Sequence, residues 1–357
     1  MGGRSFLGLR KASALGYLES QLRCWSPTRE PHPFFNSLLG SSICFFGRRR
    51  RNKLGGSALT GAGKLTIEFD YIAYIAYLFI HMLTKPELLR KSVQYRKDLL
   101  QLIKTAKAGH TGGDLSCLDI LNVLYNRILR VSPETFKSPD RDYYIQSKGH
   151  CAEALFVVLA DRGFFPKSDL QTLNQFGSHY IGHPTRDVNG VEQNTGALGH
   201  GLAVAVGIAL AGKIDRRDYR VFVLLGDGEL AEGSNWEAAM TAAHYRLDNL
   251  VAIVDRNGLQ ITGSTEDVCQ LAPLDEKFAA FGFEVRRCDG NDVGDLAQTL
   301  EEVPFRPGKP SLILAKTKKG KGVSFMENVA KWHHKVPSDE EYSQAMAELE
   351  AAAAALK

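Results

Sequence analysis

The chain has 357 residues, of which 44% are hydrophobic and 24% charged, a composition typical of a soluble globular protein with one or two domains. The formal net charge of +4 is unevenly distributed: residues 1–64 hold 11 Lys or Arg and 2 acids, whereas the remainder holds 33 and 38. Basic character confined to one end gives no reason to expect a nucleic-acid partner.

The cysteines are scattered and form no CxxC pair, which argues against a disulfide framework and against a zinc site. They are Cys24, Cys44, Cys117, Cys151, Cys269 and Cys288. Free thiols fit a reducing compartment, so we expect a cytoplasmic protein.

Residues 1–85 lack a sustained helical or strand period. The apolar run from Tyr71 to Leu83 is shorter than the roughly 20 residues that span a bilayer, and Phe6 breaks the myristoylation pattern, so we expect no membrane association. The low acid content is shared with transit peptides. We nevertheless expect a disordered or non-native extension, with Met82 as a candidate native start and residues 86–357 as the functional domain.

Helices are predicted at 86–107, 115–129, 150–162, 168–176 and 195–213. Strands at 219–225, 250–255, 283–288 and 311–317 then alternate with helices at 234–245 and 292–303, and a last helix begins at Ser338 and includes 351–355. Ser234 with Glu237, and Ser338 with Glu341, have the spacing of a capping box. This alternation predicts an α/β fold, a mostly parallel sheet with helices on both faces.

The stretch VLLGDGELAEG, residues 223–233, joins a predicted strand to a glycine loop and a helix. Gly226, Gly228 and Ala231 fit the loose dinucleotide-binding pattern. Asp227 and Glu229 would repel a bare pyrophosphate, but a divalent cation removes that conflict. Asn257 follows the next strand, about 4.8 Å away in a parallel sheet. Asp227, Asn257 and the carbonyl of Leu259 are therefore the predicted Mg²⁺ ligands.

GDG followed by Asn257 resembles the thiamine diphosphate motif. Together with KAGHTGGDLS, QSKGHCAEAL, GSHYIGHP, NTGALGHG and KWHHKVP, it resembles the N-terminal half of transketolase over residues 86–340. The resemblance implies the thiamine diphosphate-binding fold and the transfer of a two-carbon ketol unit from a ketose, or its phosphate, to an aldose.

The same resemblance assigns roles to individual residues. His110, His183 and His334 would bind substrate and move protons, and Glu232 would meet its twin in a second copy of the chain. The cofactor-binding set would be His150, Gly196, Ala197, Leu198, Gly228, Asn257 and His334. Ala197 stands where the family has proline, and the sequence does not separate His333 from His334. His179, His200 and His244 are taken as structural or surface residues.

Transketolases hold the cofactor between two domains, and the second domain supplies a glutamate to the aminopyrimidine. No second α/β pattern fits this chain, so the resemblance implies a split enzyme with a partner resembling the C-terminal half. Other thiamine diphosphate enzymes remain open, namely the 2-oxo-acid dehydrogenase E1α and deoxyxylulose-phosphate synthase types. An NAD-binding oxidoreductase domain and a non-catalytic scaffold are further alternatives. The lysine-rich loop 316–325 is either solvated or close to the substrate entrance.

Overall fold

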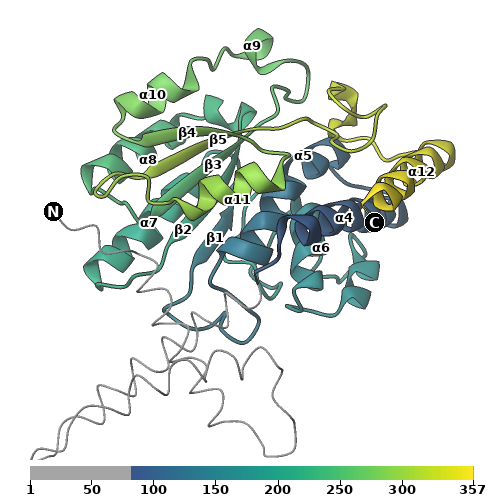
Figure 1. Cartoon of the computed structure of the whole chain (residues 1–357), viewed down its shortest axis with the longest axis horizontal. Helices are drawn as coiled ribbons and strands as arrows, with labels where there is room; N and C mark the ends of the chain where they lie inside the picture. The colour runs from purple at the N-terminus through teal and green to yellow at the C-terminus, as the bar shows by residue number, and fades with distance from the viewer. Residues whose placement is uncertain (1–81, 357) are drawn as a thin grey trace, which may run out of the picture. The chain divides into compact units, whose positions relative to one another are not determined.

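The structure is a computed structural model that describes residues 82–356 (Figure 1). A compact unit spans Met82–Lys357. The predictions for residues 1–81 lie outside the described residues. No helix in the described part is long and apolar enough to cross a membrane.

A five-stranded sheet forms the centre of this unit, with strand order β1-β2-β3-β5-β4 and every neighbouring pair parallel. The strands are β1 (Tyr143–Gln146), β2 (Val221–Gly226), β3 (Leu250–Arg256), β4 (Glu284–Asp289) and β5 (Ser311–Lys316). The predicted α/β fold is confirmed. β1 was missed because it is only four residues long and lacks a distinctive apolar run.

Two helical layers cover the two faces of the sheet (Figure 1). One face packs on α7 (Gly201–Ile214), α8 (Gly233–His244) and α10 (Leu274–Ala280). The other packs on α4 (Lys85–Ala106), α5 (Thr111–Val123), α6 (Ala152–Asp161), α11 (Val293–Glu301) and α12 (Asp339–Ala355). Alternate residues of β2 serve the two layers, as expected for a strand buried on both faces.

Short helical segments complete the unit. They are η1 (Leu124–Ile128), η2 (Lys167–Thr172), η3 (Gly228–Ala231), α9 (Thr265–Val268) and η4 (Ala330–His333). The helix predicted over 115–129 changes to a π-helix at η1, and the one predicted over 168–176 is the 3₁₀ segment η2. α10 was not predicted.

Two helix starts were placed wrongly from the sequence. The helix predicted from Thr195 begins only at Gly201, because Gly196 (φ 136°) and Gly199 (φ 87°) adopt backbone angles that a right-handed helix excludes. The Ser234–Glu237 capping box is absent, since α8 is capped at Glu232 and the Ser234 hydroxyl donates to the Gly199 carbonyl instead. The Ser338–Glu341 box of α12 is confirmed.

Candidate active site

The predicted metal ligands meet at the carboxyl edge of the sheet. Gly226 pairs with Asp255 in the β2–β3 register, so Asp227 and Asn257 follow at the same edge. Asp227 is 2% exposed; its carboxylate accepts from the Gly228 N–H at 2.8 Å and the Gly258 N–H at 2.6 Å, and pairs with Arg256 at 3.2 Å. Burial raises the pKa of Asp227, and the nearby Asp255 adds to that rise. A cation here would stabilise the ionised carboxylate.

Asn257 and Leu259 lie beside this carboxylate in the turn after β3. The Asn257 Oδ1 accepts from the Leu259 N–H at 3.0 Å, and its Nδ2 faces Asp255 Oδ2 at 3.3 Å. The Leu259 carbonyl lies 3.5 Å from the Lys319 ammonium, so a positive group already lies at this oxygen. One carboxylate, one amide and one carbonyl suit Mg²⁺, which takes oxygen ligands and keeps waters. Within residues 82–356 no cluster of three or more His, Cys, Asp or Glu could hold a metal.

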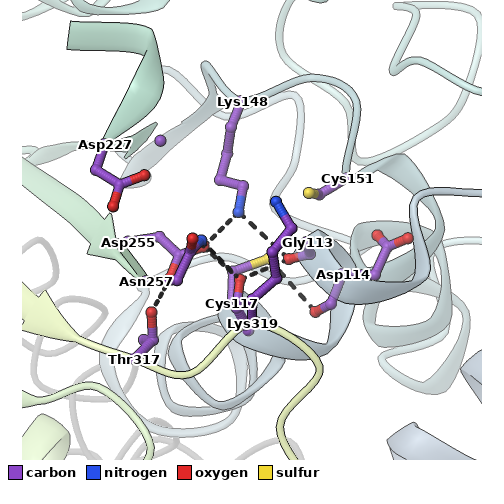
Figure 2. Close-up of polar contacts among 12 residues, drawn as sticks. Gly113, Asp114, Cys117, Lys148, Cys151, Asp227, Asp255, Asn257, Thr317 and Lys319 are labelled. Atoms are coloured by element: carbon purple, nitrogen blue, oxygen red, sulfur yellow. Dashed lines mark hydrogen bonds and ion pairs between the residues drawn. The ribbon is translucent and has the colours of Figure 1, made fainter. Parts of the chain in front are cut away.

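A buried ion pair supports the floor of the site (Figure 2). The Lys148 ammonium pairs with Asp255, which also accepts from the Ser116 hydroxyl at 2.6 Å and from the Thr317 hydroxyl. Burial would raise the pKa of Asp255, but Lys148 and these hydroxyls hold it below its usual range. Lys148 is therefore neutralised by its own carboxylate.

Lys319 is a second buried cation and was missed as a site residue. It is 2% exposed, and its ammonium donates to His333 Nδ1 at 2.9 Å. Its hydrogen-bond partners in the described structure, His333 and the Leu259 carbonyl, are both neutral acceptors. Burial lowers its pKa and the charge of Lys148 lowers it further. Figure 2 shows the two lysine side chains ending in the same region, between Asp227 and Cys151. The charges of Asp227 and Asp255 act in the opposite direction without a direct ion pair to Lys319. A buried ammonium whose hydrogen-bond partners are neutral is suited to bind an anion.

Five histidines gather beside these lysines, as the sequence motifs predicted for His110, His150, His183 and His334. The ring centre of His110 lies 5.2 Å from His150, 6.1 Å from His183, 5.6 Å from His333 and 3.9 Å from His334. His110 immediately precedes α5, and His150 lies in the turn before α6. The motifs are far apart in sequence, but the fold brings them to one place.

The structure separates the two adjacent histidines. His333 is bonded to Lys319 and stacks on His150 with ring centres 5.4 Å apart, so it lies on the lysine side. His334 is exposed, lies closest to His110 and influences His183 electrostatically. His333 therefore lies on the side of Lys319, and His334 lies on the side of His110.

Neutral imidazoles are favoured at this site. Burial lowers the pKa of His110 to about 3 and that of His333 to about 4, and the other histidines and lysines add to both shifts. Burial lowers the pKa of His150 well below its usual range as well. At neutral pH these rings can both donate and accept hydrogen bonds.

Unpartnered polar atoms and closely packed backbone border the site. Three buried polar atoms around the site have no partner: His110 Nδ1, Thr195 Oγ1 and Gln260 Nε2. A Cβ on Gly196 would lie 2.5 Å from the His183 ring, and one on Gly149 would lie 2.5 Å from the Gly196 nitrogen. The loop 195–200 and the turn 147–149 therefore pack as closely as backbone allows.

The other predicted cofactor and interface residues lie along the same loops. Gly196 and Leu198 are half-buried, whereas Ala197 and Glu232 are exposed. A Cβ on Gly199 would lie 2.5 Å from the Glu232 Cβ, so this acid borders the loop at the surface. The Gly228 N–H, predicted to face the diphosphate, is bonded to Asp227 in this structure.

Comparisons with known proteins agree with this geometry. Residues 91–352 match the family model described as transketolase, thiamine diphosphate binding domain. The chain is 50% identical over 259 residues to an apulose-4-phosphate transketolase subunit of Phocaeicola vulgatus, covering 72% of this chain and 92% of that protein. It is 41% identical over 256 residues to the 6-deoxy-6-sulfo-D-fructose transketolase subunit SqwG of Clostridium sp. (strain MSTE9), covering 71% and 93%.

Among solved structures, the transketolase of Campylobacter jejuni matches with a TM-score of 0.69 and 29% identity. The match covers 76% of this chain and 46% of that one, so this chain spans less than half of the solved transketolase.

Proposed function

This chain belongs to the transketolase family, and from that premise we propose that it is the thiamine diphosphate- and Mg²⁺-binding subunit of a two-chain transketolase. The reaction moves a two-carbon ketol unit from a ketose, or its phosphate, to an aldose. The observation that carries the proposal is the convergence of the predicted metal ligands around Asp227, the buried Lys319 and five histidines at one edge of the sheet.

The cofactor supplies the electron sink that stabilises the two-carbon fragment, and the protein binds and orients it. Asp227, Asn257 and the Leu259 carbonyl would hold the metal. Lys319 would neutralise diphosphate charge, because its buried ammonium has only neutral hydrogen-bond partners and forms no direct ion pair among the described residues. His333 would add a donor on this side once a ligand accepts from its Nε2, because Nδ1 must accept from the ammonium.

The remaining histidines would bind sugar hydroxyls. His110 keeps an unpartnered buried Nδ1, and His334 lies 3.9 Å from it by ring centres. A neutral imidazole can bind a hydroxyl group, and it can also accept a proton during the reaction and return it afterwards. We propose His110, His183 and His334 for substrate binding and proton transfer.

We infer a partner chain from the way this chain aligns with its relatives. Two relatives that carry "subunit" in their names align over 92% and 93% of their length, whereas the Campylobacter jejuni transketolase chain aligns over 46%. We propose a partner resembling the C-terminal half of transketolase, which supplies the activating glutamate. Phe176 and Ile181 are exposed and precede His183 in the same loop. Their apolar side chains would offer the partner chain a surface to pack against.

A second copy of this chain would meet the exposed Glu232, giving a heterotetramer. We propose that the functional domain covers residues 86–357, which include the family match from residue 91. Cys117, Cys151, Cys269 and Cys288 are free thiols, which fits a cytoplasmic location.

Product analysis tests the reaction class. The full chain is combined with a C-terminal-half partner, thiamine diphosphate and Mg²⁺, then given a ketose phosphate or a 2-oxo acid as donor. We expect ketol transfer to an aldose acceptor when the ketose phosphate is the donor and no reaction of the 2-oxo acid. Turnover of the 2-oxo acid in its place would assign the chain to the E1α-type enzymes.

A further inference from the structure

The second acid of the glycine loop, Glu229, is not among the predicted metal ligands. Its side chain is 2% exposed and contacts the turn that precedes His150 and the loop before α7. Oε1 accepts from the Ser147 hydroxyl and from the Gly199 N–H at 2.8 Å, and Oε2 accepts from the Gly226 N–H at 2.9 Å. One carboxylate thus joins three separate segments.

Each of these segments carries part of the proposed cofactor site. Gly226 begins the metal-binding loop, Ser147 lies three residues before His150, and Gly199 follows the Gly196–Leu198 stretch. The Ser147 hydroxyl also accepts from the Gly201 N–H at 3.1 Å, which extends the connection to the first residue of α7. The backbone carbonyl of Glu229 accepts from Asn235 Nδ2 at 2.8 Å, which adds α8.

Gly199 is held on both sides of its backbone. Its N–H donates to Glu229, and its carbonyl accepts from the Ser234 hydroxyl at 2.9 Å. Gly199 has a φ of 87°, which glycine adopts without strain. Because glycine adopts many other backbone angles as readily, this residue alone does not fix the conformation of the loop. The loop conformation therefore depends on these two side chains and on the close packing of Gly149 against Gly196.

We propose that Glu229 is a positioning residue that fixes the 195–200 loop relative to the metal-binding loop. The two loops would then hold the cofactor at the correct distance from each other. The proposal rests on the function proposed above. It separates the two acids of the loop: Asp227 binds the metal, and Glu229 fixes the backbone around it. A carboxylate suits this task because it offers two acceptor oxygens and no donor to three converging donors.

The test compares E229A, E229Q and the exposed control E276Q on α10, each as the full chain with its partner. We expect E229A to raise the dissociation constant of Mg²⁺–thiamine diphosphate by at least about tenfold, with kcat recovering to within about threefold at saturating cofactor. E229Q keeps one acceptor oxygen but places an amide N–H₂ group toward part of the three donors that face Glu229. We therefore expect its cofactor dissociation constant to lie between those of the wild type and E229A. E276Q should match the wild type.

Hydrogen exchange on the cofactor-free chain gives an independent readout. The amides of Gly199 and Gly201 should exchange faster in E229A, while amides of the distant β4 keep their wild-type rates. Unchanged exchange at Gly199, or a kcat loss that saturating cofactor does not restore, would overturn the proposal. Should the wild type bind no thiamine diphosphate, the proposed function fails, and exchange at Gly199 still decides whether Glu229 fixes the loop. If E229A does not fold, E229Q is tested in the same way.

Discussion

Replacing Lys319 with Met should weaken cofactor binding without damaging the fold. The lysine stem packs against Gly112, where an added Cβ would lie 3.1 Å from the Lys319 Cγ, and methionine keeps that apolar stem. What is lost is the ammonium that lies 2.9 Å from His333 Nδ1 and 3.5 Å from the Leu259 carbonyl.

A charge-assisted hydrogen bond contributes about 1.5–3 kcal/mol. Since about 1.4 kcal/mol corresponds to a tenfold change, the dissociation constant of Mg²⁺–thiamine diphosphate should rise by roughly 10- to 150-fold. Titration calorimetry with the full chain measures it. K318M is the matched control, because the neighbouring Lys318 is half exposed and pairs with Glu327 at 3.1 Å. That variant should bind within about twofold of the wild type.

The same substitution should change the titration of His333. Burial and then the charge of Lys319 lower the pKa of His333 to about 4, so removing the ammonium should raise that pKa. NMR titration of the ring in the cofactor-free chain would show it. An unchanged cofactor affinity together with an unchanged His333 titration would refute the assignment of Lys319 to the anion site.

Three further predictions concern the buried ionisable groups. D227A should abolish Mg²⁺-dependent cofactor binding, and calorimetry with and without Mg²⁺ that gave wild-type affinity would remove Asp227 from the metal site. His110, with its pKa lowered to about 3, stays neutral in the folded state while the unfolded chain takes up a proton below 6.5. Stability should therefore be lost as pH falls below 6.5, by up to about 3 kcal/mol at pH 4.5. H110N should remove that part of the difference in urea denaturation, and a pH dependence identical to the wild type would contradict it. The effect of Asp114 has the opposite sign, because burial raises its pKa to about 7, beside the buried Glu153, whose pKa burial raises as well. Its contribution is present at low pH and lost as pH rises through about 7, so D114N should gain stability over the wild type at pH 8 but not at pH 4.5. Equal differences at both pH values would show that the Asp114 pKa is not raised.

The sequence predicted the sheet and most helices because long apolar runs and capping residues are local signals. The capping box of Ser338 and Glu341 is confirmed, and the parallel sheet follows from strand–helix alternation. The failures have local causes too. The Ala- and Gly-rich run from Thr195 was taken as helix, although Gly196 and Gly199 need positive φ, and nothing in the sequence distinguishes such glycines from small helical residues.

The site was predicted only in part. The spacing from Gly228 to Asn257 placed two strand ends together, and the structure confirms that proximity. Lys319 was missed because it lies in a lysine-rich loop whose composition is typical of solvated segments, and only burial separates it from Lys318 and Lys321. The Lys148–Asp255 pair and the contacts of Glu229 join segments distant in sequence, so local patterns could not reveal them.

Ketol transfer measured with the full chain, Mg²⁺ and thiamine diphosphate, alone and after co-expression with a C-terminal-half partner, tests the central claim most directly. We predict transfer only when the partner is present. Transfer by the chain alone would contradict the split-enzyme assignment. Absence of transfer with the partner, while the cofactor still binds, would contradict the transketolase reaction proposed for this site.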